Sequence, residues 1–181
     1  MLSAFLPEEL ACRRLLLRRP LRKDYAELYD FYSDKSVAHW LSWSVYTDKE
    51  NLALDINRYQ DLWDCGKEYY WVIELTATSS VVGSIAVGVS GNDADIGFML
   101  SAGCQGQGYA TEAARGLLDV LTASDRIDRV VALTAVGNDA SVAVLEKVGM
   151  QCRGVAPGFM ICPNISDQPR DAFIYSIDCK K

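Results

Sequence analysis

The sequence predicts an α+β fold in which a mixed, mostly antiparallel sheet contains one central βαβ crossover. Three β-rich runs, residues 69–75, 81–89 and 94–100, follow one another with only short turns between them, which is typical of antiparallel strands. After them come an amphipathic helical run and a β-rich run at residues 129–135, the order of a crossover helix and a parallel strand. The chain has 181 residues, half of them hydrophobic, which is enough for the core of a single domain spanning residues 1–181.

The first part of the chain supplies one strand and two helices. Residues 14–18 form the first predicted strand. A helix is expected over residues 24–32, with Asp24 as its N-terminal cap, and a second helix over residues 48–63. The apolar residues that recur at helical spacing are Tyr25, Leu28 and Tyr32 in the first helix and Leu52, Ile56, Tyr59 and Trp63 in the second.

The second part of the chain supplies the hairpin and the crossover. Residues 76–80 are expected to be the turn of an antiparallel hairpin, and Gly91-Asn92 is a second turn signal. In a βαβ unit, ligands bind beyond the carboxyl ends of the strands, where residues 105–110 lie. The remaining expected elements are a helix at residues 138–148 and strands at residues 150–155 and 172–177.

Composition excludes several classes of protein. Lys plus Arg number 18 and Asp plus Glu 24, so the net charge of −6 argues against a nucleic-acid surface and mildly favours cationic partners. The six cysteines never stand two to four residues apart and the only histidine is His39, so no metal site is expected. The first residues lack the pattern of a signal peptide, and no run reaches about 18 apolar residues. A cytoplasmic protein with free thiols, acting away from membranes, is expected.

Residues 104–115, Cys-Gln-Gly-Gln-Gly-Tyr-Ala-Thr-Glu-Ala-Ala-Arg, place a glycine-rich turn directly before a helix. The first N–H groups of a helix lack partners and the helix dipole is positive there, so this turn is a candidate site for phosphate oxygens. An ordinary loop with an accidental glycine pair is the alternative. A dinucleotide site would need glycine or alanine at the position of Thr111, and a P-loop would need a following Gly-Lys-Ser/Thr. Cys104, far from His39 in sequence, is interpreted as a packing residue.

Several segments resemble the GNAT superfamily of N-acetyltransferases. Gln105-x-x-Gly108-x-Ala110 matches the acetyl-CoA motif of that superfamily, (Arg/Gln)-x-x-Gly-x-(Gly/Ala). The sequence from Gly108 to Ala113 is similar to the motif of the RimJ/RimL branch, which acetylates N-terminal amines of ribosomal proteins. Further matching landmarks, in the family's order, are residues 13–18, residues 95–98, Asn138-x-x-Ser141 with residues 145–150, and residues 170–176.

The resemblance implies the GNAT fold, with a sheet of about 6–7 strands and helices on both faces. It also implies acetyl-CoA as co-substrate, with its pyrophosphate on the backbone N–H groups of residues 105–110 and its pantetheine arm along the strand ending at Leu100. The amine would attack the thioester directly in a ternary complex. The residues expected to contact acetyl-CoA are Phe98, Met99, Leu100, Gln105, Gly106, Gln107, Gly108, Tyr109, Ala110, Thr111, Asn138 and Ser141.

Asp95 is the predicted general base. It stands where many members of the superfamily carry a glutamate on the strand beside the thioester, although a solvated strand carboxylate would fit the same pattern. Glu74 and Glu68 are the reserve candidates, because the hairpin strand that bears Glu74 could border the same cleft.

The sequence also offers a candidate for the group that protonates the leaving thiolate of coenzyme A. Many GNAT enzymes use a tyrosine at the position that Leu145 occupies here. Ser141, one helical turn earlier, is the expected substitute, and a serine bonded to backbone or water is the alternative. Asn138 is expected both to cap its helix and to contact the coenzyme.

In the family, the first two helices and a late loop shape the acceptor groove. Trp40, Trp43 and residues 157–169 are therefore the expected substrate walls, although tryptophans also serve as core. The expected reaction is transfer of acetyl to a primary amine, the N-terminal α-amine of a ribosomal or other protein. A small amine (amino acid, polyamine or antibiotic) and a non-catalytic acetyl-CoA-binding module are the alternatives, and a homodimer is one assembly that the sequence allows.

Overall fold

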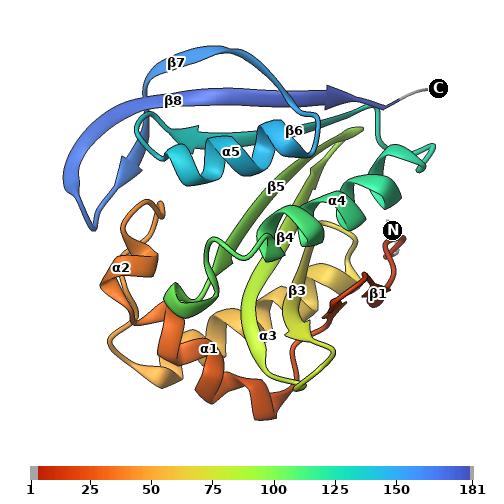
Figure 1. Cartoon of the computed structure of the whole chain (residues 1–181), viewed down its shortest axis with the longest axis vertical. Helices are drawn as coiled ribbons and strands as arrows, with labels where there is room; N and C mark the ends of the chain where they lie inside the picture. Colours follow the sequence, from red (N-terminus) through yellow and green to blue (C-terminus); the bar gives the residue numbers. More distant parts are fainter. Residues whose placement is uncertain (1–3, 180–181) are drawn as a thin grey trace.

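A computed structural model describes residues 4–179, and its centre is one eight-stranded sheet (Figure 1). The strands lie in the order β1-β2-β3-β4-β5-β6-β8-β7, and neighbours are antiparallel except for the parallel pair β5 and β6. This arrangement confirms the predicted α+β fold, and the strand that was not predicted is the three-residue β1 at the sheet edge. The bounds are β1 Glu9–Ala11, β2 Leu15–Arg18, β3 Glu68–Leu75, β4 Val81–Ser90, β5 Asp93–Leu100, β6 Arg129–Ala135, β7 Gln151–Cys162 and β8 Ser166–Asp178.

Helices lie on both faces of the sheet, as Figure 1 shows. On one face, apolar residues of the first three helices pack against side chains of β3 and β5 such as Tyr70 and Met99. On the other face, α4 buries Leu117 and Leu121 against the second apolar cluster. Burial of these two clusters is the main stabilising contribution to the fold. The bounds are α1 Tyr25–Tyr32, α2 Lys35–Ala38, α3 Lys49–Asp64, α4 Tyr109–Thr122 and α5 Asp139–Lys147, with 3-10 turns at Arg22–Asp24 and Ala102–Cys104.

Two aspartates near the starts of helices in the first part of the chain have different partners. Asp48 caps α3, because its carboxylate accepts a hydrogen bond from the backbone N–H of Glu50. The prediction that Asp24 caps α1 is wrong. The carboxylate of Asp24 instead accepts two hydrogen bonds from the guanidinium of Arg18, at 2.7 and 2.9 Å, and one from the backbone N–H of Leu21. The ionised guanidinium of Arg18 forms stronger hydrogen bonds with this carboxylate than the backbone N–H groups at the start of α1 would.

The stretch of residues 157–169 is not the loop that the sequence suggested. β7 and β8 continue through it as a long antiparallel ribbon that turns at residues 163–165. Gly154, Pro157 and Gly158 interrupt the alternation of apolar and polar residues that indicates a strand. The full length of these two strands could therefore not be predicted from the sequence pattern. The tip of the ribbon reaches the end of α2 and the segment that follows it (Figure 1), where Asn164 contacts Ala38 and Trp43.

The parallel strands β5 and β6 stay paired for only a short distance. Asp93, Ala94 and Asp95 pair with residues 129–131, and no pairing follows beyond Asp95. Past this point β5 keeps its bonds to β4, while β6 keeps its bonds to β8. The sheet therefore opens between residues 96–100 and 132–135, directly after the last paired residue Asp95.

Candidate active site

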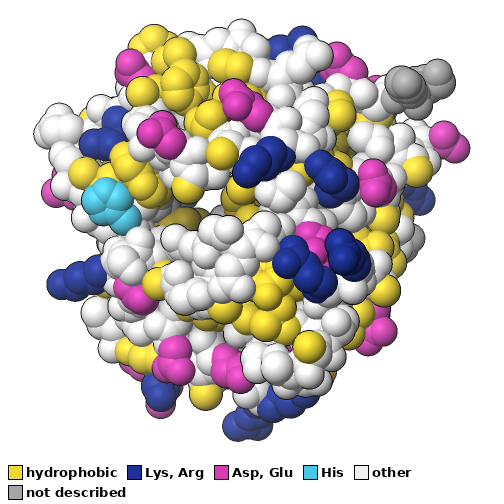
Figure 2. All heavy atoms as spheres, in the orientation of Figure 1, with side chains coloured by type: hydrophobic (Ala, Val, Ile, Leu, Met, Phe, Trp, Pro, Cys, Tyr) yellow, Lys and Arg dark blue, Asp and Glu magenta, His cyan; other side chains and the backbone are white. Residues whose placement is uncertain are grey.

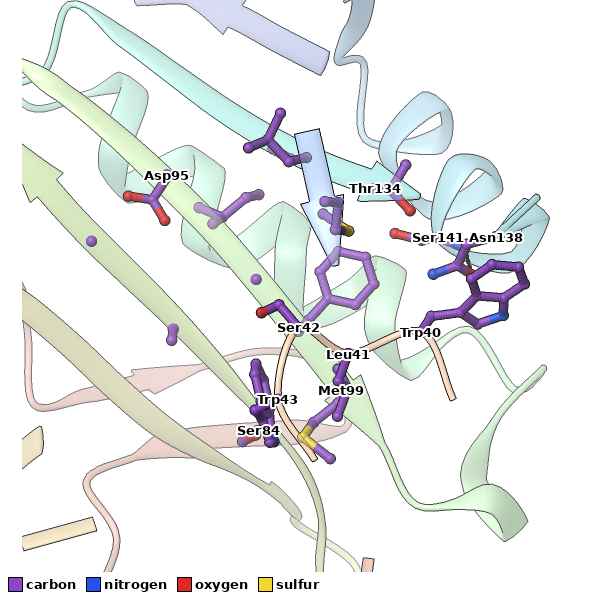
Figure 3. Close-up of a pocket in the computed structure, with 18 of the residues that line it drawn as sticks. Trp40, Leu41, Ser42, Trp43, Ser84, Asp95, Met99, Thr134, Asn138 and Ser141 are labelled. Carbon is purple, nitrogen blue, oxygen red and sulfur yellow. Dashed lines mark hydrogen bonds between the residues drawn. The ribbon is translucent and has the colours of Figure 1, made fainter. Parts of the chain in front are cut away.

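The opening between β5 and β6 leads into a cavity of about 630 Å³ (Figure 3). The side chains that line it come from both parted strands, from β3 and β4, from the start of α5 and from residues 40–43. Met160 on the ribbon closes one wall. A space of this size, bordered by groups from so many elements, is the main candidate active site among the described residues.

One side of the cavity is a trough over the sheet, with small residues along its floor. Gly88 on β4 lies between Glu68 on β3 and Asp95 on β5, and Ala86 lies in the next row between Tyr70 and a glycine. A Cβ at Gly88 would come within 2.5 Å of Oδ1 of Asp95, so a larger residue there would displace this carboxylate. The glycine lets the Asp95 side chain lie across β4 toward Glu68.

Two carboxylates line this trough, Asp95 and Glu68. The walls around Asp95 hold water away from it, and this desolvation raises the pKa of its carboxyl. Desolvation also raises the pKa of Glu68; the positive charge of Arg58 opposes this shift, and the negative charge of Asp95 adds to it. Both groups are thus better proton acceptors than ordinary surface carboxylates.

The other buried ionisable groups of the trough are phenols. The hydroxyl of Tyr32 lies 2.9 Å from the hydroxyl of Tyr70 and 3.3 Å from Oγ of Ser84. Burial raises the pKa of Tyr32 to about 12, so this phenol remains protonated at neutral pH. The carboxylates are therefore the groups of the trough that can take up a proton there.

Glu74, the other candidate base, is not brought to the cavity. Its carboxylate lies 2.7 Å from the guanidinium of Arg18, which also binds Asp24. The strand that carries Glu74 does border the cleft, but at Glu68 and Tyr70. The strand thus borders the cleft, whereas Glu74 itself belongs to a cluster of ion pairs around Arg18.

Aromatic side chains form the wall above the trough. Trp40 and Trp43 line the cavity, in agreement with their expected position (Figure 3). The ring of Trp43 stacks on Tyr32 with centroids 6.3 Å apart, and Tyr59 stacks on Tyr70 at 4.9 Å. Among the described residues that line the cavity there is no lysine or arginine. The wall thus offers aromatic faces and negative charge, a combination that suits cations.

The ribbon tip holds this aromatic wall in place. The side-chain amide of Asn164 donates hydrogen bonds to the carbonyls of Ala38 and Trp43, at 2.7 and 2.8 Å. Its oxygen accepts one from the backbone N–H of Val45 at 3.1 Å. Pattern reading missed Asn164, because its partners lie more than a hundred residues earlier in the chain.

Asn164→Ala is expected to raise the KM for the acceptor amine about 5- to 10-fold, because the tryptophan wall loses the three hydrogen bonds that hold it and acceptor binding weakens by about 1 to 1.4 kcal/mol. The KM for acetyl-CoA should stay unchanged. Steady-state kinetics with each substrate varied in turn measures both. The control is Asp167→Ala, an exposed position on the same ribbon. Equal changes in both KM values would contradict this assignment.

The glycine-rich turn adopts the conformation that an anion site needs. Gly106 and Gly108 have φ of +73° and +81°, and Gly108 directly precedes α4. The guanidinium of Arg14 covers this turn: it donates to the carbonyl of Gln107 at 3.2 Å and to Glu112 at 2.7 Å. Arg14 was not predicted as a part of this site, although it belongs to the landmark at residues 13–18. Figure 2 shows basic side chains gathered on this face of the molecule.

The predicted coenzyme contacts divide between two places. Phe98 and Met99 of β5 line the cavity, and so do Asn138 and Ser141 of α5. Leu100, the last residue of β5, and residues 105–111, which form the turn and the start of α4, do not line it.

The start of α5 carries the predicted cap. The side-chain oxygen of Asn138 accepts a hydrogen bond from the backbone N–H of Ser141 at 3.3 Å (Figure 3). Ser141 and the buried Leu145 then face the cavity from one side of this helix. Thr134, at the end of β6, faces it as well and was not predicted.

Two kinds of site are not found in the described part of the chain. Residues 4–179 contain no group of three or more His, Cys, Asp or Glu side chains that could hold a metal ion. None of the helices within this range is long and apolar enough to cross a membrane.

The comparisons with known proteins agree on a family. A family model described as "Acetyltransferase (GNAT) domain" matches residues 14–151. The uncharacterized N-acetyltransferase YnaD of Bacillus subtilis is 26% identical over 167 residues, which cover 91% of this chain and 94% of YnaD.

Solved structures share the fold at low sequence identity. RimL, a ribosomal α-N-protein acetyltransferase in complex with coenzyme A, has a TM-score of 0.85 at 20% identity, covering 94% of this chain and 98% of RimL. Spermidine N-acetyltransferase from Vibrio cholerae, in complex with CoA and spermine, has a TM-score of 0.78 at 17% identity, covering 92% and 96%. At these identities the likeness establishes the fold.

Proposed function

This chain belongs to the acetyltransferase (GNAT) domain family, and we propose that it acetylates the N-terminal α-amine of a polypeptide. As a member of this family it is an N-acetyltransferase with acetyl-CoA as the donor. The observation that carries the proposed acceptor is the lining of the trough: Glu68 and Asp95, aromatic rings, and no basic side chain among the described residues. A free amino acid would bring its own carboxylate close to both acidic groups, whereas a peptide N-terminus has a neutral amide at that place.

The coenzyme would lie across the turn and the opening. Its pyrophosphate fits the positive start of α4 after Gly108, where the left-handed glycines let the backbone approach an anion. Its arm would run beside residues 96–100 of β5, which lack a partner strand on that side. The thioester would then reach the junction of β5 and β6 near Asp95.

Asp95 would accept the proton that the amine loses. An α-amine has a pKa near 7.7 to 8.0, about 2.5 units below that of lysine, so a modest base suffices for it. Asp95 faces the trough at the junction of the strands, and desolvation raises its pKa toward that of the amine. Glu68 would attract the ammonium form before it is deprotonated.

The choice of acceptor has support from the branch motif and from the likeness to RimL, which is described as acting on a ribosomal protein. A polyamine is the second candidate. The observation that favours it is the second carboxylate, since Glu68 could hold a second ammonium group while Asp95 serves the first.

Peptides with a free Ser or Ala N-terminus and one internal lysine should be acetylated on the α-amine. At neutral pH the neutral form of the α-amine is about 300-fold more abundant than that of lysine. Mass spectrometry of the products locates the acetyl group, and thiol release from acetyl-CoA gives the rate.

The matched control is the same peptide with a blocked N-terminus, which should react slowly or not at all. Spermidine and free amino acids complete the panel. Acetyl groups mainly on lysine would contradict the proposed acceptor, and turnover with spermidine alone would establish the second candidate instead.

A further inference from the structure

Thr134 carries a buried hydroxyl without a partner. The residue is 3% exposed, and its Oγ1 makes no hydrogen bond within the described residues. A hydroxyl removed from water without a hydrogen bond destabilises a fold, so most buried hydroxyls have one. The exception at Thr134 points to a partner that is bound only during function.

The surroundings of Thr134 identify the kind of partner. Thr134 lies near the end of β6, and it lines the cavity together with Ser141 and Leu145 of α5 (Figure 3). Its backbone is already paired with Phe173 on β8, so the strand fixes the position of the side chain. The hydroxyl is therefore held in place in a wall that is otherwise partly apolar.

The position along the sheet places Thr134 beside the opening. Val131 is the last residue of β6 that pairs with β5, opposite Asp95, and Thr134 follows three residues later. At about 3.3 Å per residue it lies roughly 10 Å from the junction of the strands. This is the stretch through which the arm of acetyl-CoA would pass in the proposed placement.

We propose that the Thr134 hydroxyl hydrogen-bonds the pantetheine arm of acetyl-CoA, in the stretch between the coenzyme turn and the thioester. The arm is a flexible chain whose amide and thioester groups lose water when they enter the opening, and each then needs a polar partner. The buried Leu145 of α5, which lines the same cavity, offers no polar group. Thr134 of β6 supplies a hydroxyl there, and Ser141 of α5 lines the same cavity.

Thr134→Val tests this inference, because valine keeps the shape of threonine and removes the hydroxyl. The variant should bind acetyl-CoA about 5- to 10-fold more weakly in calorimetric titration, the loss of one hydrogen bond. The Tm of the ligand-free protein should be unchanged or higher, because the hydroxyl has no partner to lose. The acceptor plays no part in either measurement, so a failure of the proposed acceptor would leave this test intact.

Thr134→Ser is the matched control, since it keeps the hydroxyl, and it should bind acetyl-CoA within about twofold of the wild type. An unchanged affinity of Thr134→Val would overturn the inference. A clear fall in the Tm of ligand-free Thr134→Val would overturn it too, since the hydroxyl would then have a partner within the fold.

Discussion

Gly108→Asp is expected to weaken acetyl-CoA binding by at least about 100-fold, the equivalent of losing two charge-assisted hydrogen bonds. Gly108 precedes α4 with φ of +81°, at the end of the turn proposed to hold the pyrophosphate. A side chain there would point at the guanidinium of Arg14, whose Nη2 is 3.5 Å from the position of a Cβ. The new carboxylate would repel the phosphates and neutralise Arg14 at the same time. Calorimetric titration with acetyl-CoA measures the loss.

Gly108→Asn is the matched control for this variant. Asparagine has the same size and the same backbone strain at positive φ, about 1–2 kcal/mol, but it carries no charge. It should bind acetyl-CoA clearly better than Gly108→Asp does, while both variants show the same Tm. Equal affinities of Gly108→Asp and the wild type would show that the coenzyme binds elsewhere.

Asp95→Asn is expected to lower kcat by about 100-fold or more, the usual contribution of a general base. The affinity for acetyl-CoA should change little, since the arm would contact the backbone of β5 rather than this carboxylate. In the wild type, activity should fall as the pH drops, because Asp95 and the amine both take up protons. Desolvation raises the pKa of Asp95, so this loss begins at a higher pH than it would for a surface aspartate. The rate deficit of Asp95→Asn should therefore be largest between the raised pKa of Asp95 and about pH 8, where the carboxylate is ionised and most of the amine is still protonated.

The Tm of Asp95→Asn provides a second test of the environment of this carboxyl. A carboxyl whose pKa is raised in the folded state stabilises the fold only at low pH, and this contribution is lost as the pH rises through the folded pKa. At neutral pH the uncharged asparagine should thus leave the Tm unchanged or raise it.

Two carboxylate variants serve as controls for Asp95→Asn. Glu74→Gln should keep kcat, because Glu74 does not line the cavity, and should lower the Tm, because Arg18 loses a partner. Glu68→Gln should mainly raise the KM for the acceptor. A normal pH–rate profile in Asp95→Asn together with a flattened one in Glu68→Gln would transfer the role of base to Glu68.

Local signals were sufficient to predict most of the fold. The helix after Gly108 and the hairpin around residues 76–80 each depend on a periodicity or a turn within a few residues, and the structure confirms both. Asp48, where the second helix was expected to begin, caps α3 through the backbone of Glu50, a close neighbour in sequence. The cap at Asp24 failed because Arg18, on another element, binds that carboxylate more strongly.

The candidate site was predicted less completely, because it depends on contacts between distant segments. Asp95 and the tryptophans were expected at the cleft and do line it. Glu74 and Glu68 could not be told apart from sequence, since they lie near opposite ends of one strand and the sequence does not show which end borders the cavity. Thr134 carries no motif, and its importance follows from an unpaired hydroxyl that a sequence cannot reveal.

The aromatic wall and the glycine-rich turn depend on different parts of the chain. The aromatic wall around Trp43 is held by a residue 121 positions later, while the turn at Gly108 closes with partners that precede it. During synthesis, the segment of the proposed coenzyme turn is therefore made before the ribbon that holds the aromatic wall. Under the proposed function, changes at the ribbon tip would alter acceptor preference without changing the coenzyme turn. The acceptor preference would then depend on the ribbon tip as well as on the trough residues Glu68 and Asp95.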